Sequence, residues 1–184
     1  MNPSRYARRL IPAIFPALLI LGAHTMASAQ NLPILINIDE GTVEVELTDA
    51  PMSEPYRLSY GPQGHCQPEV AITAAADGVA ARHTRSCHGQ GRDEGTIFTL
   101  TLSTHASHTL QLKAGRINLR GQPGVAAFGS FDSEVKVGRI NNRRSDLSMQ
   151  VGRRFLVGAT AQHQQDGLGG QLKVSISYGE LNIL

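Results

Sequence analysis

The chain has 184 residues, with 17 Lys or Arg against 15 Asp or Glu, so its formal net charge is +2. Charged residues make up 17% of it and aromatic residues 5%, Trp is absent, and Gly occurs 19 times. This composition excludes a highly charged disordered tail and a coiled coil. The length fits one domain, or at most two.

The first 29 residues have the features of a secretory signal peptide. Arginines at positions 5, 8 and 9 precede an apolar run over 10–23, and Ala27-Ser28-Ala29 offers the small residues that a signal peptidase accepts before Gln30. The run is short for the ~20 residues of a membrane span, and prolines interrupt it. We therefore expect export to the periplasm or cell surface of a Gram-negative-type bacterium, without a membrane span after cleavage.

Removal of residues 1–29 changes the charge balance. This stretch holds three arginines and no acid, so 14 Lys or Arg remain against 15 Asp or Glu, a net charge of −1. A surface for nucleic acid is therefore not expected.

Residues 30–184 are predicted to form a single all-β domain. Apolar and polar residues alternate, with the period of half-buried strands, over Thr42–Leu47, Phe98–Leu102 and Leu172–Ser177. Gly, Asn, Asp and Pro separate such runs, as turns require. The Ala-rich stretch 71–81 contains Asp77-Gly78, which favours two short strands or a strand and a turn over a helix.

A Gly-x-Ile-Asn motif recurs in the half 109–184, whereas the half 30–108 is divergent. Copies of the motif begin at Gly115, Gly138 and Gly179, and the last has Leu in place of Ile. A distant first copy is Glu40–Glu44, and a degenerate one is Val157–Thr160.

Each glycine of the repeat accepts a positive φ and can turn a corner between strands. The aliphatic residue two positions later would point inward, and the asparagine after it would point outward. Asn118, Asn141 and Asn182 would then stack as an amide ladder, because stacked strands lie about 4.8 Å apart. This pattern predicts a β-solenoid-like or rolled stack of strands. Turn asparagines in unrelated hairpins are the alternative.

The stretch from about Thr109 to Leu184 resembles the bacterial "putative adhesin" family of exported β-repeat domains. The match is strongest over 166–183, where a Gly-rich turn leads into an alternating strand, a glycine and a last short apolar strand. The resemblance implies a β-solenoid-like or rolled stack of sheet, an adhesin-like role and no catalytic residues. It does not extend to the half 30–108.

Two cysteines, Cys66 and Cys87, are expected to form a disulfide in an oxidising compartment. His65 and His88 adjoin them and His83 lies nearby, so a tetrahedral metal site is the alternative. Adjacent residues of an extended strand point to opposite faces, which argues against convergence on a metal. No cofactor is expected.

Catalytic motifs are not found. The sequence has no Gly-x-Ser-x-Gly elbow and no His-Glu-x-x-His, so we expect a protein without enzymatic activity. Asp39-Glu40 precedes a glycine and is interpreted as a turn rather than as paired carboxylates for glycoside hydrolysis. His105 and His108 are predicted to lie exposed in a turn, and a weak metal site with His83 or His88 is the alternative.

Arginines are dense between positions 116 and 154. Arg116 and Arg139 occupy the same repeat position, so stacking would bring like charges together at a repulsive cost. Such a stripe beside asparagines could bind an anionic envelope polymer. The candidate anion-binding face consists of Arg116, Asn118, Arg139, Asn141 and Arg143. A solvated face balanced by acidic neighbours is the alternative.

The sequence thus favours an exported, non-enzymatic envelope protein that acts as a structural or interaction module. A periplasmic metal-binding protein that uses the histidines is the second interpretation. The last predicted strand, Glu180–Leu184, could be an exposed edge that pairs with another protein.

Overall fold

The computed structural model describes residues 33–65, 67–75, 77–85, 95–121, 124–144, 149–154, 157–164 and 169–184. The predicted signal peptide, both cysteines and His88 lie outside these ranges. No helix within the described ranges is long and apolar enough to cross a membrane.

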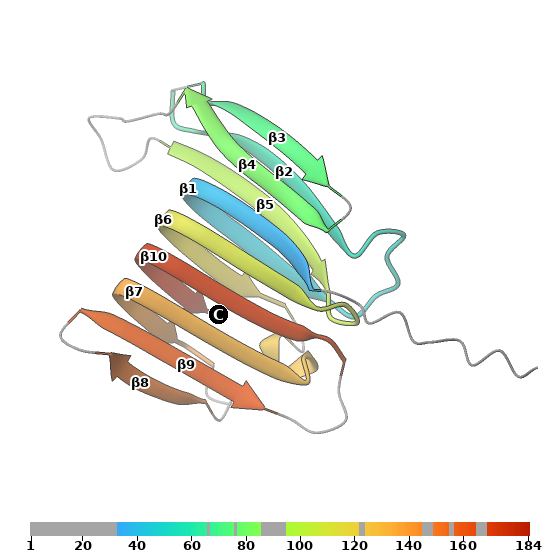
Figure 1. The fold of residues 1–184 in the computed structure, drawn as a ribbon, viewed down its shortest axis with the longest axis vertical. Coiled ribbons are helices and arrows are strands. Elements are labelled where there is room, and N and C mark those ends of the chain that lie inside the picture. Colours follow the sequence, from blue (N-terminus) through green and yellow to red (C-terminus); the bar gives the residue numbers. More distant parts are fainter. Residues whose placement is uncertain are drawn as a thin grey trace, which may run out of the picture.

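The described residues form a ten-stranded sheet with one short 3-10 turn (Figure 1). The elements are β1 (Ile34–Thr48), β2 (Tyr56–Gln63), β3 (Glu69–Ala75), β4 (Gly78–Arg85), β5 (Gly95–Ser103), β6 (His108–Arg120), η1 (Gly124–Ala127), β7 (Ser130–Asn142), β8 (Gln150–Arg154), β9 (Gly158–Gln164) and β10 (Gln171–Ile183). The all-β prediction is confirmed, and the sheet is not closed into a barrel.

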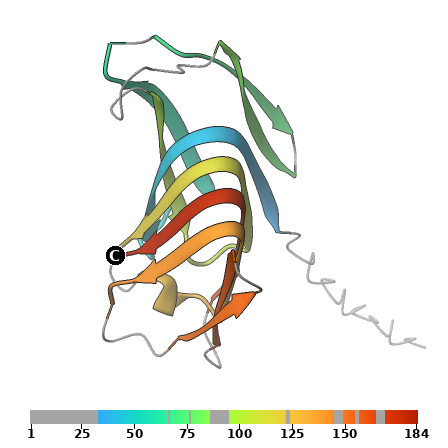
Figure 2. The same ribbon diagram turned by 90° about the vertical axis from the view of Figure 1, so that its left-hand side faces the viewer.

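Four long parallel strands, in the order β1-β6-β10-β7, form the centre of the sheet. Each strand arches over, so its first half lies in one layer and its second half in another (Figure 2). The first layer is completed by β4 and β3 beside β1, and by β9 and β8 beside β7. The second layer is completed by β5 and β2, which continue from the second half of β1.

A row of glycines marks the bend. Gly41 pairs with Gly115, Gly115 with Gly179, and Gly179 with Gly138, so one glycine of each central strand lies beside the next. All four have a positive φ, between 128° and 142°. A Cβ on Gly115 would collide with the carbonyl oxygen of Gly41, and one on Gly179 with that of Gly115. Glycine is therefore required for its backbone conformation and for the close approach of neighbouring strands.

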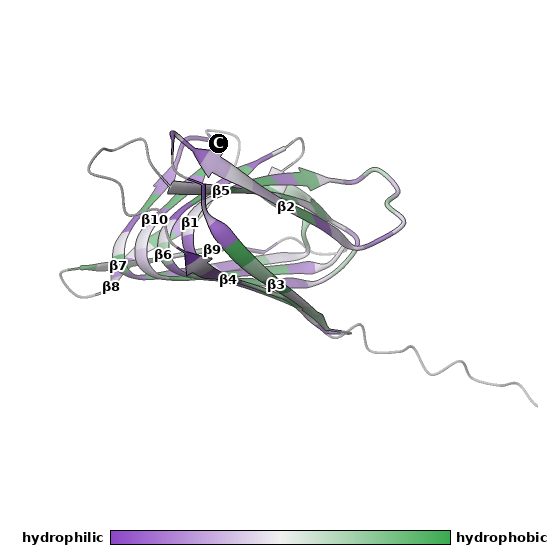
Figure 3. Ribbon diagram, turned by 90° about the horizontal axis from the view of Figure 1, so that it is seen from above, coloured by the Kyte–Doolittle hydropathy of each residue, from purple (hydrophilic) through white to green (hydrophobic). Residues whose placement is uncertain are grey.

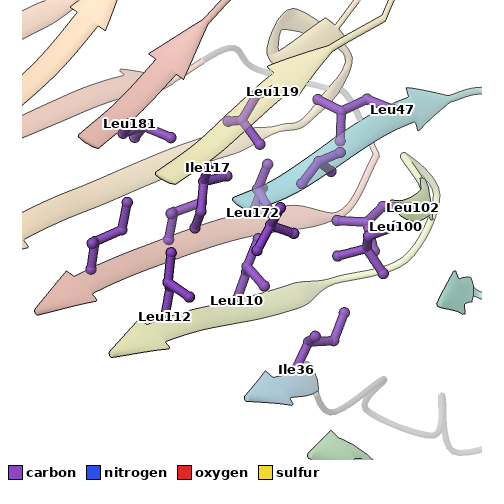
Figure 4. Packing of buried hydrophobic residues seen from close by; sticks show 14 of the residues in the cluster. Ile36, Leu47, Leu100, Leu102, Leu110, Leu112, Ile117, Leu119, Leu172 and Leu181 are labelled. Carbon is purple, nitrogen blue, oxygen red and sulfur yellow. The ribbon is translucent and has the colours of Figure 1, made fainter. Parts of the chain in front are cut away.

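The bend also changes which residues face inward. In β6, Leu110 and Leu112 are buried before the glycine, whereas Ile117 and Leu119 are buried after it. A regular strand alternates with a period of two, so this change of parity lets both halves face one core. Figure 4 shows these side chains gathered between the layers. Full burial of an aliphatic side chain stabilises the fold by about 1.5–3 kcal/mol.

The strand order bears on two expectations. A solenoid is not confirmed, because its repeats contact only their neighbours in sequence, whereas β10 lies between β6 and β7. For the same reason, the interpretation of Glu180–Leu184 as an exposed edge is wrong. The distant copy at Gly41 joins the glycine row, but Gly158 does not, since it begins the antiparallel strand β9.

Predictions for three short segments are partly confirmed and partly wrong. The stretch 71–81 does form strands, because β3 and β4 make an antiparallel hairpin. His105 is exposed as predicted, but His108 begins β6 and is buried, so its interpretation as a solvated turn residue is wrong. Asp39 and Glu40 lie within β1 at the bend rather than in a turn between elements.

Candidate functional site

An open groove of about 650 Å³ crosses the outer face of the first layer next to the bend. It runs across the strands rather than along them, since β4, β1, β6, β10 and β7 all contribute to it. The residues that line it are Asn37, Ile38, Asp39, Ala81, Arg82, Gln111, Leu112, Lys113, Lys136, Ser175 and Ser177.

Uncharged polar side chains form the floor of the groove. Asn37 pairs with Gln111, and Gln111 with Ser175, so the three lie in one row across β1, β6 and β10. They alternate along their strands with buried residues such as Ile38 and Leu112, and the period of a strand therefore turns them outward. Amide and hydroxyl groups in such a row can both donate and accept hydrogen bonds.

Three cations border this floor. Lys113 and Lys136 each stand two residues before the bend glycine of their strand, and Arg82 comes from β4. Because β10 lies between β6 and β7, the two lysines stand on strands about 10 Å apart, twice the usual strand spacing. Within the described part of the chain these three cations form no ion pair. The arginines that form ion pairs, Arg116, Arg120 and Arg139, belong to the second layer.

The acid among the described lining residues, Asp39, is held by His83 of β4. Its Oδ2 accepts a 2.7 Å hydrogen bond from the His83 amide, and its Oδ1 lies 2.7 Å from the His83 Nδ1. The other ring nitrogen of His83, Nε2, lies 2.7 Å from the Thr96 hydroxyl in β5. The ring also packs edge-on against Phe98, with centroids 5.9 Å apart.

These contacts set the ionisation of Asp39. Partial burial raises the pKa of the carboxyl. The hydrogen bonds from the His83 amide, the His83 ring and the Glu40 amide lower it, as does the charge of His83, and together they outweigh the effect of burial. The pKa therefore lies below its ordinary value of 3.8. Asp39 remains a carboxylate at neutral pH, and its negative charge is directed at His83.

The order carboxylate, imidazole and hydroxyl is that of a catalytic triad, which sequence patterns did not reveal. The accessibility is reversed, however. In hydrolases the nucleophilic hydroxyl meets the substrate and the acid is buried, whereas here the Asp39 side chain is 30% exposed and Thr96 only 3%. The network is better explained as a tie between β1, β4 and β5 at the point where β1 bends away from β4.

The predicted Arg and Asn face lies on the outer side of the second layer, away from the groove. The repulsion between its arginines is offset, because β10 places Glu180 between Arg116 and Arg139. Glu180 lies 3.4 Å from Nε of Arg116 and 2.6 Å from Nη2 of Arg139. The solvated, charge-balanced alternative thus describes these two arginines better than a free anion-binding stripe.

The asparagines of that face form a ladder of hydrogen bonds. Asn141 donates to Asn182 at 2.8 Å, Asn182 to Asn118 at 2.7 Å, and Asn118 to Glu44 at 2.6 Å. Each member stands three residues after the bend glycine of its strand. Their amides are therefore engaged with one another. All three arginines of the predicted face are exposed, and Arg143 forms no ion pair within the described residues.

The histidines of the metal-binding interpretation are not brought together. His65 is exposed just after β2, whereas the side chain of His83 is 2% exposed and has partners at both ring nitrogens. His88 lies outside the described residues. Within the described ranges, no group of three or more His, Cys, Asp or Glu residues is placed to hold a metal ion.

Comparison with known proteins adds little to this description. No family model matches the chain, and no curated protein matches it. Among solved structures, it is similar to a crystal structure titled "putative cell adhesion protein" from Clostridium sporogenes, with a TM-score of 0.36 and 9% sequence identity. The match covers 83% of this chain and 92% of that one. A likeness this distant carries no argument, so function must be argued from the residues of this chain.

Proposed function

We propose that the protein is an exported, non-enzymatic binding module of the cell envelope that holds an extended anionic polymer across its parallel strands. The observation that carries this proposal is the groove, in which three cations that form no ion pair within the described residues border a row of uncharged hydrogen-bonding side chains. The ligand that suits this pattern is a polysaccharide with repeated carboxylate or phosphate groups. Its hydroxyls would meet Asn37, Gln111 and Ser175, and its anionic groups Arg82, Lys113 and Lys136.

A polymer is favoured over a small molecule by the shape of the groove. Small-molecule sites are concave and largely apolar, whereas this groove is open, polar and crosses several strands. Each exposed cation contributes little by itself in water. Useful affinity therefore requires a ligand that touches several cations at once, and salt should weaken the binding.

The groove replaces the arginine face as the anion-binding site of this proposal. Arg116 and Arg139 share Glu180, and Arg120 lies 3.3 Å from Glu44, so an anion would have to compete with carboxylates already in place. Within the described residues, Lys113 and Lys136 form no ion pair with a carboxylate, although Asp39 lines the same groove.

The test is calorimetric titration of the purified protein at two salt concentrations. The probes are polygalacturonate, polyphosphate and, as a neutral polymer, dextran. We expect binding to one anionic polymer or both, none to dextran, and a loss of at least about tenfold in affinity in the double variant Lys113→Ser, Lys136→Ser.

The matched control is the double variant Arg57→Ser, Arg143→Ser. It removes the same charge from exposed positions outside the groove and should bind almost as well as the wild type. Equal losses in the two double variants would mean that only net charge matters, and the groove would then be rejected as a site. A wild type that binds neither anionic polymer would reject the proposed function.

A further inference from the structure

The strand β3 (Glu69–Ala75) forms a free edge of the first layer. It pairs only with β4 on one side, and no other described strand pairs with its opposite side. Five of its seven residues are exposed in a row, from Ala71 to Ala75, and Ile72 is 44% exposed. Figure 3, which looks onto this end of the sheet, shows β3 along the rim.

Over residues 70–75 this edge lacks the features that protect the other edges, and the irregularity in its pairing with β4 lies before Val70. Free edges usually carry charges, prolines or irregularities that prevent pairing with another chain. The edge strand β2 has Arg57 and Pro62, and β8 has Gly152 and Arg153. In β3, by contrast, the six residues 70–75 read Val-Ala-Ile-Thr-Ala-Ala, with no charge, glycine or proline.

We infer that β3 is a homodimer interface, in which it pairs antiparallel with β3 of a second copy about a two-fold axis at Ile72. In this register Ile72 faces Ile72, Ala71 faces Thr73, and Glu69 faces Ala75. No charged residue meets a like charge, and a segment that is uncharged over six positions is complementary to itself. A second copy is therefore the partner that this edge fits.

Neighbouring registers are disfavoured by the residues that flank β3. Antiparallel registers that keep the same pairing pattern differ by a shift of two residues along the partner. A shift in one direction would place Glu69 opposite Asp77, and like charges directly opposite destabilise a sheet. A shift in the other direction would place Pro68 opposite Ala74, and proline cannot donate to the ladder.

The dimer has a geometric consequence for the groove. Antiparallel pairing within one sheet requires a two-fold axis perpendicular to the sheet, so the outer faces of both first layers point the same way. Arg82, the groove cation nearest β3, then lies on the strand next to the interface in each copy. Two grooves on one face would bind a long polymer with greater avidity than one. The dimer itself does not depend on the groove's ligand.

The oligomeric state tests this inference. Sedimentation equilibrium of the wild type should show a monomer–dimer equilibrium. In Ile72→Lys the two lysines would face each other, so we expect dimerisation to weaken by at least about tenfold. Val151 of the edge strand β8 is 50% exposed, against 44% for Ile72, and Val151→Lys should dimerise like the wild type. A monomeric wild type at high protein concentration, or an Ile72→Lys variant that dimerises normally, would overturn the inference.

A cross-link tests the register. Residues directly opposite in an antiparallel pair have Cβ atoms about 4.5–5.5 Å apart, within reach of a disulfide after small adjustment. Ile72→Cys should therefore give a covalent dimer on mild oxidation, beyond the background that Cys66 and Cys87 give in the wild type. Val151→Cys should stay at that background. Equal cross-linking of the two cysteine variants would exclude the proposed pairing.

Discussion

Asn182 donates a 2.7 Å hydrogen bond from its side-chain amide to the side-chain oxygen of Asn118, across 64 residues of sequence. Both residues are 8% exposed, and they belong to the adjacent strands β10 and β6. A slip of one residue in either strand would turn one amide to the other face of the sheet. The ladder thus fixes the register of the central strands as well as stabilising them.

Replacement of Asn182 by Ala should be costly. Asn118 would lose a donor and Asn141 an acceptor, and a buried polar group left without a partner costs about 1–3 kcal/mol. Asn141→Ala is the matched control, since it removes one hydrogen bond at the end of the ladder. Urea unfolding should give a larger loss for the Asn182 variant, and equal losses would show that the ladder has no cooperative role.

The glycine row predicts a sharp contrast between two Gly→Ala changes. Gly115→Ala adds a Cβ that collides with the Gly41 carbonyl at a positive φ, so we expect a loss of about 3 kcal/mol or more. Gly61→Ala in β2 adds a methyl group to open space and should change stability by less than about 0.5 kcal/mol. Thermal unfolding of both variants measures the difference, and a stable Gly115→Ala variant would contradict the bend described above.

The Asp39 carboxylate should stabilise the fold through its three hydrogen-bond donors. Asp39→Ala leaves the His83 amide and ring without their partner, and we expect a loss of about 2 kcal/mol at pH 7. Glu40→Ala should cost less, because the Glu40 carboxylate lies 4.0 Å from the same Nδ1 and accepts none of these three hydrogen bonds. Because the folded pKa of Asp39 is lowered, its contribution is present above about pH 4 and is lost as the pH falls through the folded value. Chemical unfolding between pH 3 and pH 7 should show this.

We expect His108 to cause a second pH dependence of the stability, at a higher pH than that of Asp39. Its ring is buried, Nε2 lies 2.8 Å from the Ser103 carbonyl oxygen, and Nδ1 has no partner among the described residues. Burial lowers the pKa below 6.5, although the hydrogen bond to Ser103 opposes the shift. The neutral ring is therefore favoured in the folded state. The stability should be fully present above pH 6.5 and should decrease as the pH falls below it.

The variant His108→Gln isolates this effect, because glutamine is uncharged at every pH and can still donate to Ser103. Urea unfolding at pH 7.5 and pH 5 should show a smaller difference in stability for the variant than for the wild type. If the difference is unchanged, His108 is not the group responsible.

Features set by local pattern could be predicted from the sequence. Alternation predicted the strands, and the recurrence of glycine and asparagine indicated which residues form the bend and the ladder. The order of the strands could not be predicted, because a period of two does not identify a strand's neighbours. Glu180 therefore lies between Arg116 and Arg139, and a face expected to be free is paired.

The groove was missed although part of its signal was present. Lys113 and Lys136 both stand two residues before a repeat glycine, a position that alignment of the repeats would have drawn attention to. The link between Asp39 and His83 left no such signal, because 44 residues separate them and no spacing rule joins a bend in one strand to the end of another. Such contacts depend on the tertiary fold.

The most direct test of the anion-binding groove is a titration of ¹⁵N-labelled protein with a short galacturonate or phosphate oligomer, followed by NMR. The side-chain amide signals of Asn37 and Gln111 should shift together and saturate at one concentration of oligomer. Those of Asn141 and Asn182, which lie in the ladder on the other layer, should stay in place. Shifts confined to the ladder face, or no shifts with either oligomer, would contradict the account.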